Sequence, residues 1–208
     1  MIDVVIRNIK NEDLREVELV AKKAFWNLNM PGCDEHYMIH RLWNSDDYVP
    51  ELSMLAEYED KIVGSILYAK AKIKTSNTEF DTLTFGPLSV DPTFQKNGVG
   101  KQLLKKSMEK ARLLGFGSIL ICGVPTYYPK YGFITADKFG ITMPDGTNFD
   151  AFMGIELIKG SLYGIHGKFY EPSVYRPDVH DENYLKEVEM FDKDFPYMEK
   201  KVLPRQWR

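Results

Sequence analysis

The sequence is poor in cysteine, lacks long apolar runs and carries little net charge. Only Cys33 and Cys122 occur in 208 residues, without paired spacing, which predicts free thiols in a reducing compartment. No apolar run is long enough for a membrane span, and the N-terminus lacks the basic region and apolar stretch of a signal peptide. A net charge of −3 predicts no strong attraction to nucleic acid. We therefore expect a cytoplasmic location, with neither a membrane nor a nucleic acid as partner.

The composition is that of a protein with a substantial core. Hydrophobic residues make up 44% of the chain, and its length fits one domain with or without an appendage. We expect a domain over residues 1–160 and an extension over 161–208 that packs onto it. The extension is rich in apolar and aromatic side chains, such as Phe169 and Phe191, whereas disordered tails are normally poor in them.

Apolar periodicity predicts the secondary structure. It indicates strands at 4–6, 52–57, 61–73, 82–90, 118–124 and 151–158, and helices after Asn11, over 34–43, from Val99 to about Gly115 and within 181–194. Asn11 is expected to cap the first helix. The strand at 61–73 is apolar on both faces, which favours a central position, and 74–80 is typical of a loop. This mixture predicts an α/β (α+β) fold, in which helices cover both faces of one sheet.

The most informative segment consists of Gln95, Lys96, Asn97, Gly98, Val99 and Gly100, between an apolar strand and an amphipathic helix. A turn at this place sets unpaired backbone N–H groups at the positive end of a helix dipole, an arrangement that binds phosphate. Gly98 and Gly100 have no Cβ, so the backbone can bend and a ligand can approach. We therefore predict a phosphate site over Gln95 to Lys101. A turn that needs its glycines only to begin a helix is the alternative.

A second motif follows the next apolar run, at 118–124. It is a tyrosine-rich turn in which Tyr128 precedes Gly132-Phe133 by four residues. Together with the stretch from Leu88 to Pro92 and the glycine turn, this order of elements resembles the GNAT superfamily of acyl-coenzyme A N-acyltransferases over about residues 81–133. Within it, the chain is similar to a bacterial subgroup of uncharacterised small acetyltransferases. The resemblance implies a mixed, partly splayed sheet that binds acetyl-CoA where two neighbouring parallel strands diverge.

The resemblance also implies roles for individual residues. Backbone groups of Leu88, Ser89 and Val90 would bond the pantetheine arm, and Gly86-Pro87 is consistent with a bulge that frees them. Tyr128 matches the family's tyrosine that faces the thiol, and a phenol is a suitable proton donor to a thiolate. Because Pro129 disfavours helical geometry at Tyr128, Tyr127 is the alternative acid. The segment before these tyrosines is also shorter than in many relatives.

No general base is evident between residues 83 and 90, where several relatives place a glutamate. Glu57, Glu79 and Asp81 are candidates by approximate location, and a water relay is an equal alternative.

Three further residues invite a chemical interpretation. His36 and His40 stand one helical turn apart and would suit a metal, but no third ligand has a matching spacing. We therefore expect no metal, and a polar helix face near the acceptor cleft. Cys122 is either an acyl-accepting nucleophile or, as we expect, a buried small hydrophobe.

Two classes of function follow. In the first, the chain is an N-acetyltransferase that passes the acetyl group of acetyl-CoA directly to a primary amine in a ternary complex, because no activated nucleophile is evident. In the second, it binds acyl-CoA as a sensing or scaffolding module without turnover. No motif identifies the acceptor, which is a small-molecule or peptide amine. The N-terminal helices, the 74–80 loop and the extension are expected to select it, and a homodimer is compatible with the apolar extension.

Overall fold

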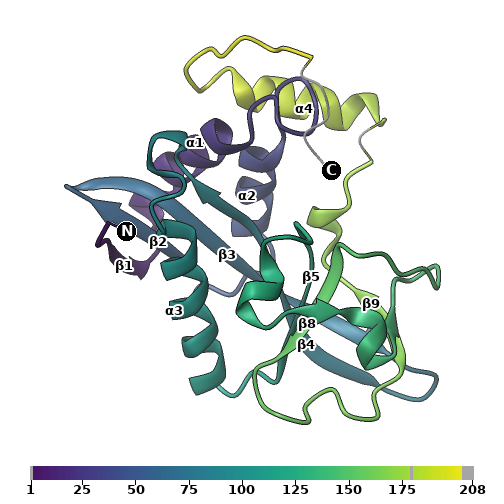
Figure 1. Ribbon diagram of the computed structural model, residues 1–208. Helices are drawn as coiled ribbons and strands as arrows, with labels where there is room; N and C mark the ends of the chain where they lie inside the picture. Colours follow the sequence, from purple (N-terminus) through teal and green to yellow (C-terminus); the bar gives the residue numbers. More distant parts are fainter. Residues whose placement is uncertain (1, 179, 203–208) are drawn as a thin grey trace.

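The computed structural model describes residues 2–178 and 180–202, which form one sheet flanked by helices (Figure 1). The strands are β1 (Val5–Asn8), β2 (Met54–Tyr58), β3 (Lys61–Lys74), β4 (Glu79–Val90), β5 (Ser118–Cys122), β6 (Ile134–Thr135), β7 (Ile141–Thr142), β8 (Phe152–Glu156) and β9 (Gly167–Tyr170). The helices are α1 (Leu14–Phe25), α2 (Glu35–Trp43), α3 (Val99–Leu113) and α4 (Glu182–Asp192). Within the described residues, no helix combines the length and the apolar character that a membrane crossing needs.

The sheet has the order β1-β2-β3-β4-β5-β8-β6, and β9 pairs with both β3 and β7. Most neighbouring strands are antiparallel, whereas β4 with β5 and β7 with β9 are parallel. β3 lies between β2 and β4 and is buried along most of its length, which confirms the predicted central position of 61–73.

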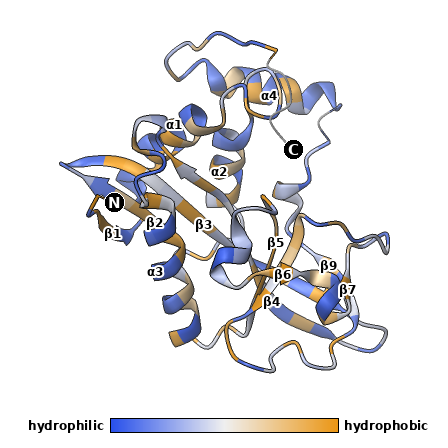
Figure 2. Ribbon diagram, viewed as in Figure 1, coloured by the Kyte–Doolittle hydropathy of each residue, from blue (hydrophilic) through white to orange (hydrophobic). Residues whose placement is uncertain are grey.

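Helices cover both faces of this sheet, as the alternation of side chains along β3 shows. Ile66 and Tyr68 pack in the core beneath α3, whereas Leu67 and Ala69 pack in a second core with α1 and α2. Successive residues of a strand point to opposite faces, so both faces of β3 need a cover. The predicted apolar stripe of α3 is buried except for its last member, Leu114, which follows the helix and is 51% exposed, and Figure 2 shows hydrophobic and hydrophilic residues alternating along this helix. The buried members of the stripe are Val99, Leu103, Leu104, Met108 and Ala111.

The sheet opens between its two central parallel strands. The register of β4 with β5 consists of one pair, Leu83 with Ile119, and β5 then pairs along its whole length with β8 on its other side. On the β3 side of β4, the register shifts between Ile66 and Tyr68, opposite Gly86-Pro87. The predicted splay and the predicted bulge are therefore both present.

Several elements differ from the sequence-based prediction. Three strands, β6, β7 and β9, were not predicted, because two-residue strands carry no readable period and β9 lies in the extension. The 74–80 segment is a tight hairpin, in which the Thr75 N–H donates to the Thr78 carbonyl at 2.9 Å. The first helix begins at Leu14 rather than after Asn11, which lies in a 3-10 turn. Asp13 ends this turn, accepting a hydrogen bond from the Lys10 N–H at 2.8 Å.

Residues after 160 return to the sheet and then cross to the helices. β9 pairs with β3 through Ile73 and Phe169, which is fully buried. α4 lies beside α1 and α2 (Figure 1), and the Tyr184 hydroxyl donates to the Asp34 carboxylate at 2.7 Å. Farther along, the Arg15 guanidinium stands 3.6 Å from the centre of the Phe195 ring. A domain boundary at residue 160 stays a prediction.

Candidate active site

The glycine turn has the backbone geometry that its sequence predicts. α3 begins at Val99, and its N-cap residue Gly98 has φ +88°, in the left-handed region that favours glycine. Because Gly98 has no side chain, it caps none of the N–H groups of the first helical turn. A Cβ at Gly100 would lie 3.2 Å from the Tyr127 hydroxyl oxygen, so the space between this backbone position and Tyr127 leaves little room for a side chain. The turn thus presents backbone N–H groups, and the positive end of α3, to one side.

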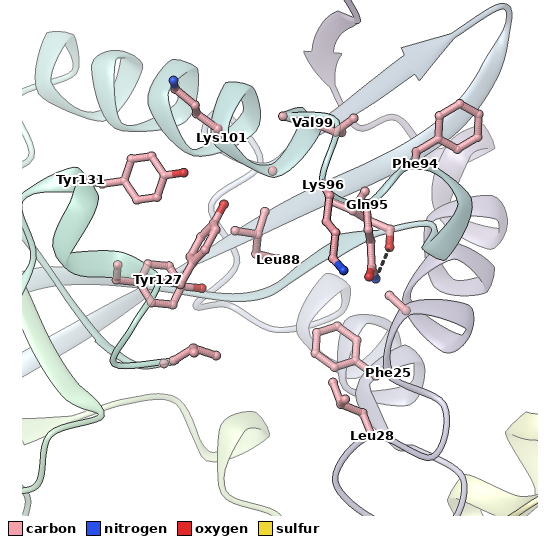
Figure 3. Close-up of a pocket in the computed structure, with 17 residues that line it drawn as sticks. Phe25, Leu28, Leu88, Phe94, Gln95, Lys96, Val99, Lys101, Tyr127 and Tyr131 are labelled. Atoms are coloured by element: carbon pink, nitrogen blue, oxygen red, sulfur yellow. Dashed lines mark hydrogen bonds between the residues drawn. The ribbon is translucent and has the colours of Figure 1, made fainter. Parts of the chain in front are cut away.

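That side is a cleft of about 600 Å³ between the end of β4, the start of α3 and the end of α1. Figure 3 shows Tyr127 and Tyr131 on one side of it and Phe25 and Leu28 on the other. Most predicted site residues line the cleft, and these are Leu88, Val90, Gln95, Lys96, Gly98, Val99, Gly100, Lys101, Tyr127 and Tyr128. Ser89 and Asn97 lie outside its lining. Phe25, Leu28 and Tyr131 were not singled out from the sequence, because they carry no motif of their own.

The end of β4 directs alternate backbone groups into the splay. The Asp91 N–H donates to the Val63 carbonyl of β3 at 2.9 Å. Because alternate residues of an antiparallel strand bond to opposite sides, Ser89 also faces β3, whereas Leu88 and Val90 face the gap toward β5. The Val90 carbonyl accepts a hydrogen bond from Gln95 Nε2 at 3.1 Å, drawn as a dashed line in Figure 3. Ser89 Oγ is buried and has no hydrogen-bond partner among the described residues. Of the three residues predicted to bond the pantetheine arm, Leu88 and Val90 thus turn their backbone groups toward the gap and Ser89 does not.

The two candidate tyrosines differ in their surroundings. Tyr128 begins η3 (Tyr128–Tyr131), and its ring packs directly over Gly123, 5.7 Å from the ring centre of Phe85. Burial raises the pKa of Tyr128 above its usual range. Tyr127 is half-buried, with its ring centre 5.2 Å from that of Tyr131. Burial, and then the contact with Tyr131, raise the pKa of Tyr127 as well. Both phenols are therefore protonated near neutral pH.

None of the three carboxylates considered as bases lies in this cleft. Glu57 is bound to Arg7, with an oxygen–nitrogen distance of 2.6 Å. Glu79 pairs with Lys74 at 2.7 Å, and Asp81 pairs with Lys72, both at the hairpin end of β4 that is remote from Val90. These carboxylates are engaged in ion pairs outside the cleft.

The two histidines of α2 do not form a polar face beside the cleft. His36 is fully buried under α4, with its Nε2 atom 3.2 Å from a carboxylate oxygen of Asp192. His40 Nδ1 lies 3.1 Å from the Glu18 carboxylate. Among the described residues, no three His, Cys, Asp or Glu side chains come together as a metal site would need.

Cys122 is also placed differently from the prediction, because it ends β5 in an exposed position. Protein atoms still surround its sulfur closely. They raise the pKa of the Cys122 thiol to about 12, mainly by desolvation. At neutral pH this thiol is protonated and a poor nucleophile.

The fold and the cleft together define a class of α/β proteins. In this class, two parallel central strands of the sheet separate beside a glycine turn at the start of a helix. The sequence profile of the Acetyltransferase (GNAT) family matches residues 22–133. The chain therefore belongs to the GNAT family of acetyltransferases.

Similarities to known proteins in sequence and in structure support this assignment. The uncharacterised N-acetyltransferase YjhQ of Escherichia coli K12 is 36% identical over 121 residues, covering 58% of this chain and 62% of the relative, or about three fifths of its length. The crystal structure of the GNAT family N-acetyltransferase YhbS of Escherichia coli, in complex with CoA, superposes with a TM-score of 0.74 at 16% identity, covering 86% of this chain and 94% of that one. A GNAT family acetyltransferase of Brucella melitensis in complex with acetyl-CoA has a TM-score of 0.66 at 20% identity, covering 83% and 98%.

Proposed function

We propose that the chain is an N-acetyltransferase that transfers the acetyl group of acetyl-CoA to a primary amine by direct attack in a ternary complex. The observation that carries this proposal is the glycine turn at the start of α3, which opens into the cleft where β4 and β5 part. The YhbS structure with CoA and the Brucella structure with acetyl-CoA support a coenzyme site in such a fold. The two free thiols support a cytoplasmic location.

The residues present fit a coenzyme A molecule. The N–H groups after Gly98 and the helix dipole suit its pyrophosphate, and Lys96 and Lys101 line the same cleft. The gap-facing backbone of Leu88 and Val90 can bond the amide groups of a pantetheine arm, as an added strand would, although the Val90 carbonyl already accepts one hydrogen bond from Gln95 Nε2. The narrow space at Gly100, between the backbone and the Tyr127 hydroxyl, admits a thin ligand and excludes a side chain.

The same residues supply the steps of acyl transfer. Backbone N–H groups at the end of β4 polarise the thioester carbonyl, as in a modest oxyanion hole. Tyr128, or Tyr127, gives a proton to the leaving thiolate, since both phenols are protonated at neutral pH. Direct transfer is favoured over a covalent acyl-enzyme because Cys122 is protonated and Cys33 is buried.

A coenzyme-release assay tests this function. The full chain is incubated with acetyl-CoA and a panel of polyamines, amino acids, aminoglycosides and peptides, and the free thiol is measured. Calorimetry measures acetyl-CoA binding in parallel, with Gly100→Asp as the control that should neither bind nor turn over. Binding without turnover on any amine would favour the acyl-CoA-sensing module, and failure to bind acetyl-CoA would overturn both functions.

A further inference from the structure

The C-terminal segment between β9 and α4 touches the sheet where β4 separates from β5. It contains η5 (Ser173–Tyr175), and the Tyr175 hydroxyl donates to the Gly86 carbonyl at 3.0 Å. The Tyr175 ring also lies over Gly86, where an added Cβ would be in ordinary van der Waals contact with the ring at 3.5 Å. Val174 and Tyr175 belong to the core shared with α1 and α2. The segment therefore reaches the splay on the face opposite Tyr128, which packs in the α3 core.

One carboxylate of this segment is nearly buried at the same place. The side chain of Glu171 is 11% exposed, and its Oε1 atom accepts a hydrogen bond from Arg176 Nε at 2.8 Å. Its charge acts on Cys122, the last residue of β5, and on the Tyr175 hydroxyl, which is bound to β4. Its partner Arg176 adjoins Tyr175, whose hydroxyl is bound to Gly86 of β4, so the carboxylate is held near the splay. Among the described residues, its Oε2 atom accepts no hydrogen bond.

The transfer reaction needs such a group on the acceptor side. A primary aliphatic amine has a pKa near that of lysine, about 10.4, so it arrives as an ammonium ion and must lose a proton before it attacks. The cleft beside the glycine turn is lined by no aspartate or glutamate among the described residues, and its tyrosines act as acids. A carboxylate held away from water attracts an ammonium ion more strongly than an exposed one.

We propose that Glu171 binds the ammonium group of the acceptor and takes its proton, so that the acceptor is a cationic primary amine entering from the α1–α2 face. This inference rests on the proposed acetyl transfer. Arg176 and Tyr175 are positioning residues that hold Glu171 at the splay. Burial raises the pKa of Glu171 even beside Arg176, which suits a proton acceptor.

In this transfer, two protons leave the acceptor nitrogen. One proton passes from the ammonium to Glu171, and the freed lone pair forms a bond to the acetyl carbon. As the carbon–sulfur bond breaks, the thiolate gains a proton from the tyrosine, the nitrogen loses its second proton to the resulting tyrosinate, and Glu171 passes its proton to water. The tyrosine and Glu171 return to their starting states with the net release of one proton to water.

The test compares Glu171→Gln with Glu189→Gln, an exposed glutamate of α4, in the full chain. With spermidine as acceptor, kcat/KM should fall by about 10²–10⁴-fold in Glu171→Gln and stay unchanged in the control. Acetyl-CoA affinity should stay within about twofold of the parent in both variants. Glu171→Asp, which keeps the charge and shortens the side chain, should recover part of the activity.

A second acceptor separates proton transfer from a loss of structure. An arylamine is neutral at pH 7 and needs no proton acceptor before attack. If the parent acetylates it, Glu171→Gln should slow that reaction far less than the spermidine reaction. Equal loss with both amines would overturn the proposal, as would full activity of Glu171→Gln with spermidine. If the parent binds acetyl-CoA but acetylates no amine, the proposed acetyltransferase function is overturned, and so is the role of Glu171 that rests on it.

Discussion

Lys22 Nζ lies 2.6 Å from a carboxylate oxygen of Asp192, and the lysine side chain is fully buried. Lys22 belongs to α1 and Asp192 to the last turn of α4. The lysine also donates to the Pro196 carbonyl at 3.0 Å, and His36 approaches the same Asp192 oxygen. The C-terminal segment thus supplies the partners of a charge that the N-terminal helices bury.

Removing the carboxylate alone should therefore destabilise the protein strongly. Asp192→Ala leaves a buried ammonium without its counterion, which costs about 3–5 kcal/mol of the free energy of unfolding. Urea denaturation measures this loss. Asp194→Ala is the matched control, because its side chain is 69% exposed and its contact with Arg15 is 3.5 Å long; its effect should stay within about 0.5 kcal/mol. Equal losses in the two variants would contradict the importance of the buried pair.

Two neighbours on α2 should give the stability opposite dependences on pH. Burial lowers the pKa of His36 to about 4, against the attraction of Asp192. Its contribution is therefore complete above pH 6.5, the usual value, and is lost as the pH falls toward 4. Burial, and then repulsion from Asp34, raise the pKa of Glu35 to about 7. Its contribution is complete below about pH 4.5 and is lost as the pH rises toward 7.

Substitution separates these two contributions. Glu35→Gln removes the loss that comes with rising pH, so its stability relative to the parent should increase by up to about 3 kcal/mol between pH 4.5 and 7. In that background, His36→Asn should reduce the loss of stability between pH 6.5 and 4.5. Urea denaturation at several pH values measures both effects. A constant difference between Glu35→Gln and the parent at every pH would show that Glu35 titrates normally in the folded state.

Those elements that form long periodic segments were predictable from the sequence. The central β3, the buried stripe of α3 and the bulge at Gly86-Pro87 follow from local patterns of apolar residues, glycine and proline. The burial of His36 was not predictable, because it depends on α4, some 150 residues later, covering α2. Glu171 was missed for the same reason: no spacing connects its segment to Gly86, and only the course of the chain after β9 brings Tyr175 of this segment against Gly86.

The glycine turn yields a direct test of coenzyme binding. Gly100→Asp places a side chain in the narrow space beside the Tyr127 hydroxyl and a negative charge where phosphate is expected. Gly98→Glu adds the same charge at a residue with φ +88°. Both variants should lose measurable acetyl-CoA affinity in calorimetry. Gly115→Asp, at the opposite end of α3 with open space around it, is the control that should bind as the parent does. Unchanged affinity in both turn variants would exclude this turn as the phosphate site.

The two adjacent tyrosines give the sharpest test of mechanism. If Tyr128 protonates the leaving thiolate, Tyr128→Phe should lower turnover by about 10²–10⁴-fold with acetyl-CoA affinity nearly intact. The Tyr128 ring packs over Gly123 and beside Phe85, and phenylalanine preserves this packing, so the folded structure should persist. Tyr127→Phe is the paired variant, since its hydroxyl lies near Gly100 and Tyr131. Steady-state kinetics of both variants decide which tyrosine is the acid. Loss of turnover only in Tyr127→Phe would assign the proton donor to Tyr127. Full turnover in both variants would mean that water protonates the leaving thiolate.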